Sequence, residues 1–288
     1  MPTLTAPDFS LHTTLTSGQT FRWKEHAGWF VGVMGASVVK IRQDGETLQY
    51  ESSERELSPN RLAHYFALDH DLNRIRRSID VDWQIHQAMS HHRGLRILRQ
   101  DGWEALASFI CASFNNIVRI EGMIERLCQA YGDPIELPGV RRFTFPSPER
   151  VASTSERRLR SVGLGYRAPY LKHTARLVAE RRLLLDELQQ TDYTMTKRAL
   201  LCCDGVGEKV ADCVALFGFA KYEAFPIDVW MERVMGYYFR HRRMTRRRLQ
   251  TYALAHFGPY AGYAQQYLYH YVRNIRRVNR EKIFCPSS

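Results

Sequence analysis

The sequence predicts an α+β protein that is mainly α-helical, with an antiparallel β-sheet domain at residues 1–92 and a helical domain at residues 93–288. Short β-branched segments separated by glycine turns occur only near the N-terminus. Further on, apolar residues recur at helical spacing, and serine, proline and glycine mark helix ends. A chain of 288 residues without repeats or low-complexity linkers is long enough to bury a sizeable core.

Three strand candidates define the N-terminal sheet. They cover residues 29–33, 37–41 and 47–50, and each is rich in β-branched or aromatic residues. Gly35 separates the first two, and Asp44-Gly45 predicts a tight hairpin between the second and third, so the sheet is expected to be antiparallel. Ser58-Pro59 then predicts a helix start. Its inward residues are Leu62, Tyr65 and Phe66.

The second region is expected to be helical throughout. The clearest helix covers residues 117–131 and ends at Gly132, and an apolar helix precedes it. A Ser-Pro pair and a serine-rich run predict two later helix starts, with Gly163 ending the second helix. Residues 165–167 are expected to form a loop, because Pro169 opposes immediate helix continuation.

The most informative stretch is residues 200–230, LLCCDGVGEKVADCVALFGFAKYEAFPIDVW. Its glycine-flanked turn, Gly205-Val206-Gly207, precedes an apolar segment with helical spacing, which predicts a buried helix. Glycines let backbone amides face outward at the start of a helix, where the helix already favours an anion. A P-loop is excluded, because GxxxxGK[ST] is absent, and no strand precedes the turn as a dinucleotide fingerprint requires.

Lys209 and Asp228 are the candidate reactive groups of this stretch. Lys209 lies in the first helical turn, where the helix end and apolar neighbours predict a lowered pKa and therefore a nucleophilic amine. An extended return is long enough to bring Asp228 back to Lys209, and Asp228 also predicts a helix N-cap. Read from composition alone, a solvent-exposed lysine and a purely structural cap remain open.

Several segments resemble the 8-oxoguanine DNA glycosylase/AP lyases of the helix-hairpin-helix (HhH-GPD) superfamily. GVGEKVADCV and FPIDVW carry the hairpin and Gly/Pro…Asp signature, and SGQTFRW, FNNIVR, VGLGYRA and GPYAGYAQ match along nearly the whole chain. The resemblance implies a two-lobed helical domain with its hairpin near residues 200–218, and double-stranded DNA containing 8-oxoguanine as partner. It implies that Lys209 attacks the sugar C1′ of a flipped nucleotide and forms a Schiff base, that β-elimination follows, and that Asp228 stabilises the positive sugar. No metal or organic cofactor is implied.

The resemblance also assigns a base pocket. It implies that the carbonyl of Gly18 reads the damaged base, that Gln265 and Tyr269 bind its edge and stack on its face, and that Cys213 lies on the opposite face. Gln265 and Tyr269 are four residues apart and therefore share one helix face. Composition alone is equally compatible with a turn at Gly18, a surface glutamine and a core tyrosine.

Contacts to the undamaged strand are assigned in the same way. Asn115 and Arg119 match the family, whereas Phe114 stands where the family has the first of three asparagines. Phe114 either stacks on the unpaired base or packs into the helical core. Tyr166 is implied as a wedge and Arg167 as a contact to the estranged base. Contacts to the DNA backbone are expected from Gly205, Val206, Gly207, Asn116 and Trp230.

Charge and cysteine content agree with an intracellular DNA-binding protein. Forty-one basic against thirty acidic residues give a net charge of +11, and the 240–248 run is the densest basic cluster, suited to nonspecific DNA affinity. The six cysteines lie mostly in apolar helical patterns without any C-x2-C pair, which excludes a zinc site or a four-cysteine iron–sulfur loop. Without a signal peptide or an apolar run of membrane length, the protein is expected in the cytoplasm or nucleoid of a prokaryote or the nucleus of a eukaryote, as a monomer.

Two other functions stay open at this point. The chain is alternatively a noncatalytic helix-hairpin-helix DNA-binding module, in which Lys209 and Asp228 are incidental, or a bifunctional glycosylase for a different damaged base. Borohydride trapping on lesion DNA separates the first alternative, because only a Schiff base is reduced to a covalent adduct.

Overall fold

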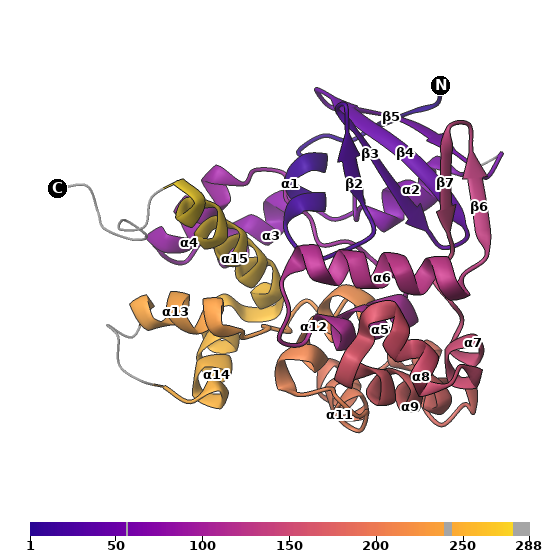
Figure 1. Cartoon of the computed structure of the whole chain (residues 1–288). Helices are drawn as coiled ribbons and strands as arrows, with labels where there is room; N and C mark the ends of the chain where they lie inside the picture. The colour runs from indigo at the N-terminus through magenta and orange to yellow at the C-terminus, as the bar shows by residue number, and fades with distance from the viewer. Residues whose placement is uncertain (56, 239–243, 279–288) are drawn as a thin grey trace.

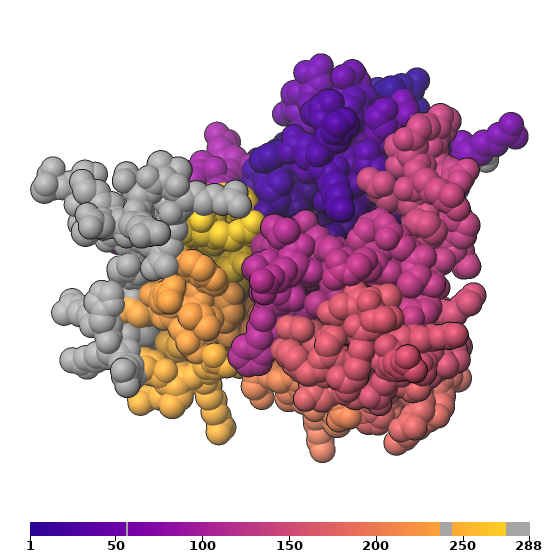
Figure 2. Space-filling view, viewed as in Figure 1, coloured from indigo at the N-terminus to yellow at the C-terminus, as the bar shows by residue number. Residues whose placement is uncertain are grey.

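The computed structural model describes residues 1–55, 57–238 and 244–278. An N-terminal antiparallel sheet sits above a larger helical region, which confirms the expected fold class (Figure 1). The space-filling view shows the sheet domain, in indigo, resting directly on the magenta surface of the helical region (Figure 2). One hydrophobic cluster lies under the sheet, and a larger one forms the core of the helical region and also contains Phe21, Ile75 and Ile85 from the N-terminal part of the chain.

The N-terminal sheet has five strands in the order β1-β5-β4-β3-β2, all antiparallel. The strands are β1 Thr3–Thr5, β2 Lys24–His26, β3 Trp29–Met34, β4 Ser37–Asp44 and β5 Thr47–Ser52. The three expected strands are therefore confirmed as β3, β4 and β5. Strands β1 and β2 escaped prediction because each has three residues and neither buries an alternating face.

Helices α1 Leu11–Thr16 and α2 Pro59–Tyr65 pack with the sheet. Helices α3 Leu72–Ile79 and α4 Trp83–His91 contact α15 (Ala261–Val278) instead, and their buried residues Ile75 and Ile85 belong to the core of the helical region. Ser58 caps α2 through its side chain, as the Ser-Pro signal predicted. Leu62 and Phe66 are buried against the sheet together with Ile41 and Leu48. Gln19, directly after Gly18 in the loop that follows α1, accepts from the amide of Leu98 at 2.7 Å and donates to the carbonyl of Arg96 at 2.9 Å, which ties this loop to the segment that leads into the helical region.

A β-hairpin within the second region corrects the expectation of helix throughout. Its strands are β6 Pro134–Leu137 and β7 Val140–Phe143. Leu137 packs on Val31 and Val38, so the hairpin adds a small cluster to the outer side of the N-terminal sheet (Figure 1). Each of these strands has only four residues, and most of their side chains are exposed or half-exposed. The sequence therefore shows no clear alternation of apolar and polar residues here.

The remaining elements are helical: α5 Gly102–Ala112, α6 Ile117–Tyr131, α7 Pro148–Ser153, α8 Glu156–Leu159, η1 Arg160–Leu164, η2 Gly165–Arg167, α9 Ala168–Ala179, α10 Leu185–Leu188, α11 Tyr193–Leu201, α12 Glu208–Phe219, α13 Val229–Tyr238, α14 Arg246–Phe257, η3 Gly258–Tyr260 and α15 Ala261–Val278. The expected helix over residues 117–131 is confirmed as α6, and Asn116 caps it. The loop expected at residues 165–167 is wrong, because η2 leads straight into α9. Pro169 lies in the first turn of α9, where its missing N–H costs no helical hydrogen bond.

Helix α12 is the central element of the helical domain, and two sets of contacts hold it in place. It crosses α5 closely, because a Cβ on Gly218 would lie 2.9 Å from the Cβ of Ala105. Asp212, the one charged residue in its apolar segment, accepts a hydrogen bond from the Tyr193 hydroxyl at 2.6 Å and one from Gln250 at 2.8 Å. The ammonium of Lys197 lies 2.9 Å from the same carboxylate. Asp212 therefore ties α12 to both α11 and α14 and does not face the reactive site.

Candidate active site

The turn before α12 presents uncapped backbone amides. Gly205 has a φ of 77°, and a Cβ there would lie 2.7 Å from the Tyr170 ring, so only glycine fits without displacing that ring. Gly207 is the N-cap, and no described side chain caps the helix, which leaves its first amides for an outside anion. Val206 differs from its neighbours. Its side chain is buried and its amide donates to the Cys203 carbonyl at 3.1 Å, so neither group is available to DNA.

Lys209 opens a small cavity on the inner side of α12. Cys213 and Phe217 follow it at helical spacing and line the same cavity, which has a volume of about 40 Å³. The Lys209 ammonium lies 5.4 Å from the centre of the Phe109 ring, which comes from α5. A volume close to that of one water means that the pocket must open before a base can enter.

The electrostatics of Lys209 correct the expectation of a lowered pKa. Burial alone lowers the pKa of Lys209, but its interactions with Cys213 and with the carboxylate of Asp228 outweigh burial and hold that pKa above its ordinary value. Burial has the opposite effect on Cys213, whose thiol pKa it raises to about 11. In the free protein Lys209 is therefore an ammonium ion that must lose a proton before it can act as a nucleophile.

Asp228 combines a structural and an electrostatic position. Its Oδ1 accepts hydrogen bonds from the amides of Trp230 at 2.9 Å and Met231 at 2.8 Å, so it caps α13 as expected. It also lines the cavity together with Lys209. The extended return from α12 thus brings the two candidate reactive groups together.

The expected base-pocket residues all line this cavity: Gly18, Cys213, Gln265 and Tyr269. No described residue donates a hydrogen bond to the carbonyl of Gly18, whose backbone has a φ of 85°. Gln265 is 5% exposed, and its Oε1 has no hydrogen-bond partner among the described residues. Two carbonyl acceptors therefore await a donor at the cavity.

Four further residues line the cavity and were missed by sequence reasoning: Phe109, Phe217, Pro226 and Gln266. The rings of Phe109 and Phe217 stack with centroids 5.5 Å apart. Gln266 donates to the carbonyl of Ser17 at 3.1 Å and so fixes the Gly18 loop against α15. Phe217 could have been predicted from the sequence, because it lies eight residues after Lys209 and therefore on the same face of the helix.

A second, open groove begins one helical turn beyond the cavity. Ser113, the C-cap of α5, follows Phe109 by four residues, which is about 6 Å along the helix. The groove has a volume of about 620 Å³ and is lined by Phe114, Asn115, Val118, Arg119, Gly122, Met123, Arg126, Gly163 and Arg167. Three arginines give it a positive lining.

Phe114 projects from this groove rather than into the core. It is 100% exposed and has a φ of 51°, a left-handed conformation that costs energy for a phenylalanine. The alternative that Phe114 packs in the helical core is therefore excluded. Beside it, Asn115 accepts from the amide of Asn116, and Asn116 caps α6 by accepting from the amide of Arg119 at 3.0 Å. The side chain of Arg119 is exposed and takes no part in the cap.

Tyr166 and Arg167 meet the groove at its other wall. Tyr166 is half-exposed, and its hydroxyl donates to the carbonyl of Ser113 at 3.2 Å. Arg167 is buried, stacks its guanidinium 4.3 Å from the centre of the Tyr166 ring, and donates from Nε to the same carbonyl at 3.1 Å. Arg167 therefore joins η2 to the end of α5 in this state, and Tyr166 is the more accessible of the pair.

The remaining expected residues lie at the edges of the site. Trp230 lies in the first turn of α13, two residues after Asp228, and the guanidinium of Arg233 lies 5.2 Å from the centre of its ring. Of the basic run at 240–248, residues 240–243 lie outside the described residues. Arg246, Arg247 and Arg248 are exposed in the first turn of α14.

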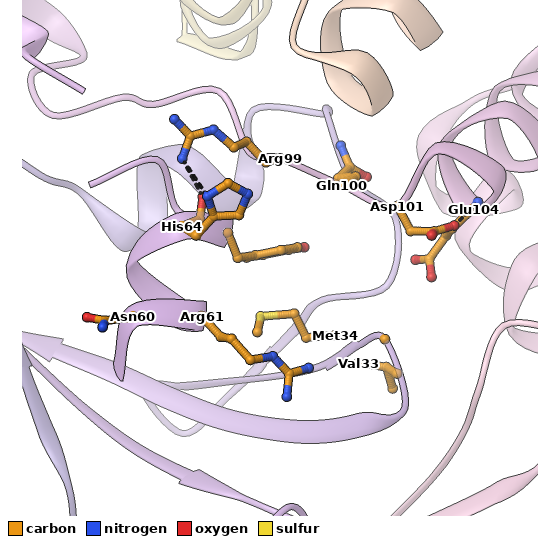
Figure 3. A pocket seen from close by; sticks show the side chains of 11 residues that line it. Val33, Met34, Asn60, Arg61, His64, Arg99, Gln100, Asp101 and Glu104 are labelled. Atoms are coloured by element: carbon orange, nitrogen blue, oxygen red, sulfur yellow. Dashed lines mark hydrogen bonds between the residues drawn. The ribbon is translucent and has the colours of Figure 1, made fainter. Parts of the chain in front are cut away.

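A larger cavity lies away from the candidate reactive groups (Figure 3). It has a volume of about 370 Å³ and opens where the sheet domain meets the start of α5, beside Arg61, His64 and Arg99. None of the residues expected to take part in catalysis or DNA binding lines it. Arg61 is paired with Glu54 and Arg99 with Asp69, so its cations are already neutralised.

Within residues 1–55, 57–238 and 244–278, no group of three or more His, Cys, Asp or Glu side chains is placed to hold a metal ion. Within those ranges, no helix has both the length and the apolar character needed to cross a bilayer. Of the five cysteines described, four are buried thiols and Cys202 is exposed.

An N-terminal sheet domain joined to a helical domain, with a lysine at a hairpin-led helix facing an aspartate N-cap, defines the class of base-excision DNA glycosylases. Residues 3–106 match the N-terminal domain of 8-oxoguanine DNA glycosylase, and residues 107–256 match the HhH-GPD superfamily of base excision DNA repair proteins. The chain therefore belongs to the HhH-GPD superfamily, and within it to the 8-oxoguanine DNA glycosylase family.

Relatives in three organisms agree with this membership. The chain is 30% identical to a probable N-glycosylase/DNA lyase of Methanothermobacter thermautotrophicus, over 95% of this chain and 96% of the relative. It is 33% identical to the N-glycosylase/DNA lyase of Saccharomyces cerevisiae, over 79% and 67%. The Clostridium acetobutylicum 8-oxoguanine glycosylase/lyase, solved with double-stranded DNA containing cytosine opposite 8-oxoguanine, superposes with a TM-score of 0.90 at 28% identity, covering 96% of this chain and 99% of that one.

Proposed function

We propose that this protein excises 8-oxoguanine from double-stranded DNA and then cleaves the strand at the resulting site. The observation that carries the proposal is the joint position of Lys209, Asp228 and the unpaired Gln265 acceptor around one cavity. A base buried in a duplex cannot expose its glycosidic carbon to a lysine within a protein pocket. The nucleotide must therefore flip out, and its entry must open the cavity.

The reaction begins with proton loss from Lys209. Entry of the base excludes water from the cavity and favours the neutral amine. The amine then attacks C1′, the C1′–N9 bond breaks, and its electron pair leaves with the base, which takes up a proton. Asp228 stabilises the positive charge that develops on the sugar. Opening of the C1′–O4′ bond gives the Schiff base, and loss of a proton from C2′ expels the 3′ phosphate.

Recognition of the lesion follows from the two unpaired acceptors. 8-Oxoguanine carries a proton on N7, where guanine has a bare acceptor. The Gly18 carbonyl accepts from that N–H, but it would face a lone pair on guanine, a loss on the order of 1–3 kcal/mol. The Gln265 Oε1 accepts from the N–H groups of the base edge, and Tyr269 packs beside it.

The DNA backbone is held at the uncapped start of α12. Its free amides and positive helix end suit a phosphate, and the exposed Gly205 and Gly207 let the backbone approach closely. The groove beside Phe114 receives the opposite strand, where Arg119 offers donors to the unpaired base. Tyr166 wedges into the gap left by the flipped nucleotide. We also propose that the protein acts inside the cell and as a monomer; that each of these groups comes from one chain supports the monomer.

Borohydride trapping tests the proposal directly. Wild-type protein should form a covalent adduct with a duplex that contains 8-oxoguanine, and Lys209→Gln should form none while still binding the duplex. Lys221→Gln removes a lysine outside the cavity, near the end of α12, and serves as the matched control. A trapped adduct with Lys209→Gln would show that another amine is the nucleophile. Absence of an adduct with every damaged duplex would favour the noncatalytic DNA-binding module.

A further inference from the structure

Arg273 lies one helical turn after Tyr269 on α15 and presents an unpaired donor to the base pocket. Its Nη1 is buried and has no hydrogen-bond partner among the described residues. A Cβ built on Gly18 would lie 2.8 Å from this nitrogen, and 3.6 Å from the Tyr269 ring. A buried guanidinium N–H without a partner is costly, so its retention beside the pocket points to an acceptor that arrives with the substrate.

The surroundings of Arg273 place its charge on the pocket side. Its guanidinium also meets the Tyr269 hydroxyl: burial and Asp228 raise the pKa of Tyr269, whereas the charges of Arg273 and Lys209 and a hydrogen bond with Arg273 lower it, so Nη1 is the unpartnered nitrogen of the group. Glu121, from α6, is the nearby carboxylate; burial raises the pKa of Glu121, and Lys24 and Arg273 oppose that rise. Nη1 itself is shielded from solvent, so a DNA phosphate on the outer surface does not reach it. An acceptor inside the pocket does.

The chemistry of the lesion supplies such an acceptor. In 8-oxoguanine the N7–H donor and the C8 carbonyl acceptor are adjacent on one edge of the ring. Under the proposed function the Gly18 carbonyl accepts from N7–H, which brings the C8 oxygen next to Gly18, where Nη1 lies. Guanine has a C–H at this position and would leave the guanidinium unpaired.

We propose that Arg273 is a specificity-determining residue that donates a hydrogen bond from Nη1 to the C8 oxygen of the damaged base. The inference rests on the proposed function and deepens it. Together, the Gly18 carbonyl and the Arg273 guanidinium read both atoms that distinguish 8-oxoguanine from guanine. A charge-assisted hydrogen bond of this kind discriminates by roughly tenfold or more in rate.

The test compares 8-oxoguanine with 8-thioguanine, which keeps the N7–H but has a sulfur atom, a weak acceptor, at C8. Single-turnover excision rates are measured for both lesions in one duplex, opposite cytosine. Wild type should excise 8-oxoguanine at least roughly tenfold faster. In Arg273→Met, which keeps an unbranched stem without a donor, the ratio of the two rates should fall towards one. Arg273→Lys keeps a cationic donor and should retain part of the preference.

Tyr269→Phe is the matched control, because it removes the hydroxyl beside Arg273 and keeps the ring. It should retain the preference for oxygen. Equal loss on both lesions in Arg273→Met would overturn the inference, since Arg273 would then position Tyr269 or the DNA rather than read C8. If the ratio of the two rates fell as far in Arg273→Lys as in Arg273→Met, the inference would also be overturned, because a cationic donor at this position would then make no difference. If wild type released neither base, the proposed function itself would fail.

Discussion

Replacing Phe114 with asparagine should affect stability and activity in opposite directions. Phe114 is 100% exposed, so its removal leaves no cavity, and its φ of 51° is a conformation that asparagine tolerates better. The free energy of unfolding should rise by up to about 1 kcal/mol, which corresponds to roughly 2 °C in melting temperature. In the complex, the ring stacks on whichever base remains opposite the lesion, an interaction of about 1–3 kcal/mol. Its loss should slow excision by roughly five- to 150-fold.

The opposite-base preference is the sharper readout of this substitution. Phenylalanine stacks on any base, and Arg167 is bonded to Ser113, so Arg119 is the exposed donor that can favour cytosine. Wild type should therefore prefer cytosine weakly and process the lesion opposite other bases too. Phe114→Asn adds a donor and an acceptor and should sharpen the ranking.

The assay is single-turnover excision with the lesion opposite each of the four bases, together with thermal unfolding of each variant. Phe114→Leu controls for bulk without an aromatic ring and should lose rate without gaining selectivity. An unchanged four-way ranking in Phe114→Asn would refute the stacking role. A fall in melting temperature of several degrees would show that Phe114 packs on the protein.

Three further predictions concern the cavity. Asp228→Asn keeps a cap for the Trp230 and Met231 amides, so stability should change by less than about 0.5 kcal/mol while excision slows strongly; Asp228→Ala should lose about 1 kcal/mol as well. Equal activity of Asp228→Asn and wild type would remove Asp228 from the chemistry. Because the pKa of Lys209 is raised, the excision rate should rise by about tenfold for each pH unit through the neutral range. Cys213→Ala removes one of the interactions that raise this pKa, so the rise should move to lower pH. A wild-type rate that levels off near pH 7 would contradict a raised pKa of Lys209. Gln265→Leu removes an unpaired buried acceptor, so the free energy of unfolding should stay the same or rise by up to about 1 kcal/mol. The excision rate should fall by about an order of magnitude. An unchanged excision rate would show that Gln265 does not recognise the base.

The sequence by itself determined the elements that depend on local patterns. The Ser58 cap, the long strands of the sheet and α6 all follow from side-chain periodicity and helix-start residues, which act over a few neighbouring positions. The return of Asp228 towards Lys209 was likewise predictable, because chain length alone made it possible and the residue's role as a cap fixed its place. The short strands β1, β2, β6 and β7 were missed because so few residues carry no readable alternation.

Only the tertiary structure decided the electrostatics and the free donors of the site. The direction of the Lys209 pKa shift depends on how near Cys213 and Asp228 lie. The position of Lys209 in the first turn of an apolar helix predicted only the lowering effect of burial. Arg273 appears in the sequence as one basic residue among many, and its role emerges only where its Nη1 meets Gly18 across more than two hundred and fifty residues of chain. The sequence left two positions open for Phe114, and the structure decides between them, because its left-handed backbone places the ring in solvent. Contacts between distant segments fix desolvation, charge and exposure, and no local pattern encodes them.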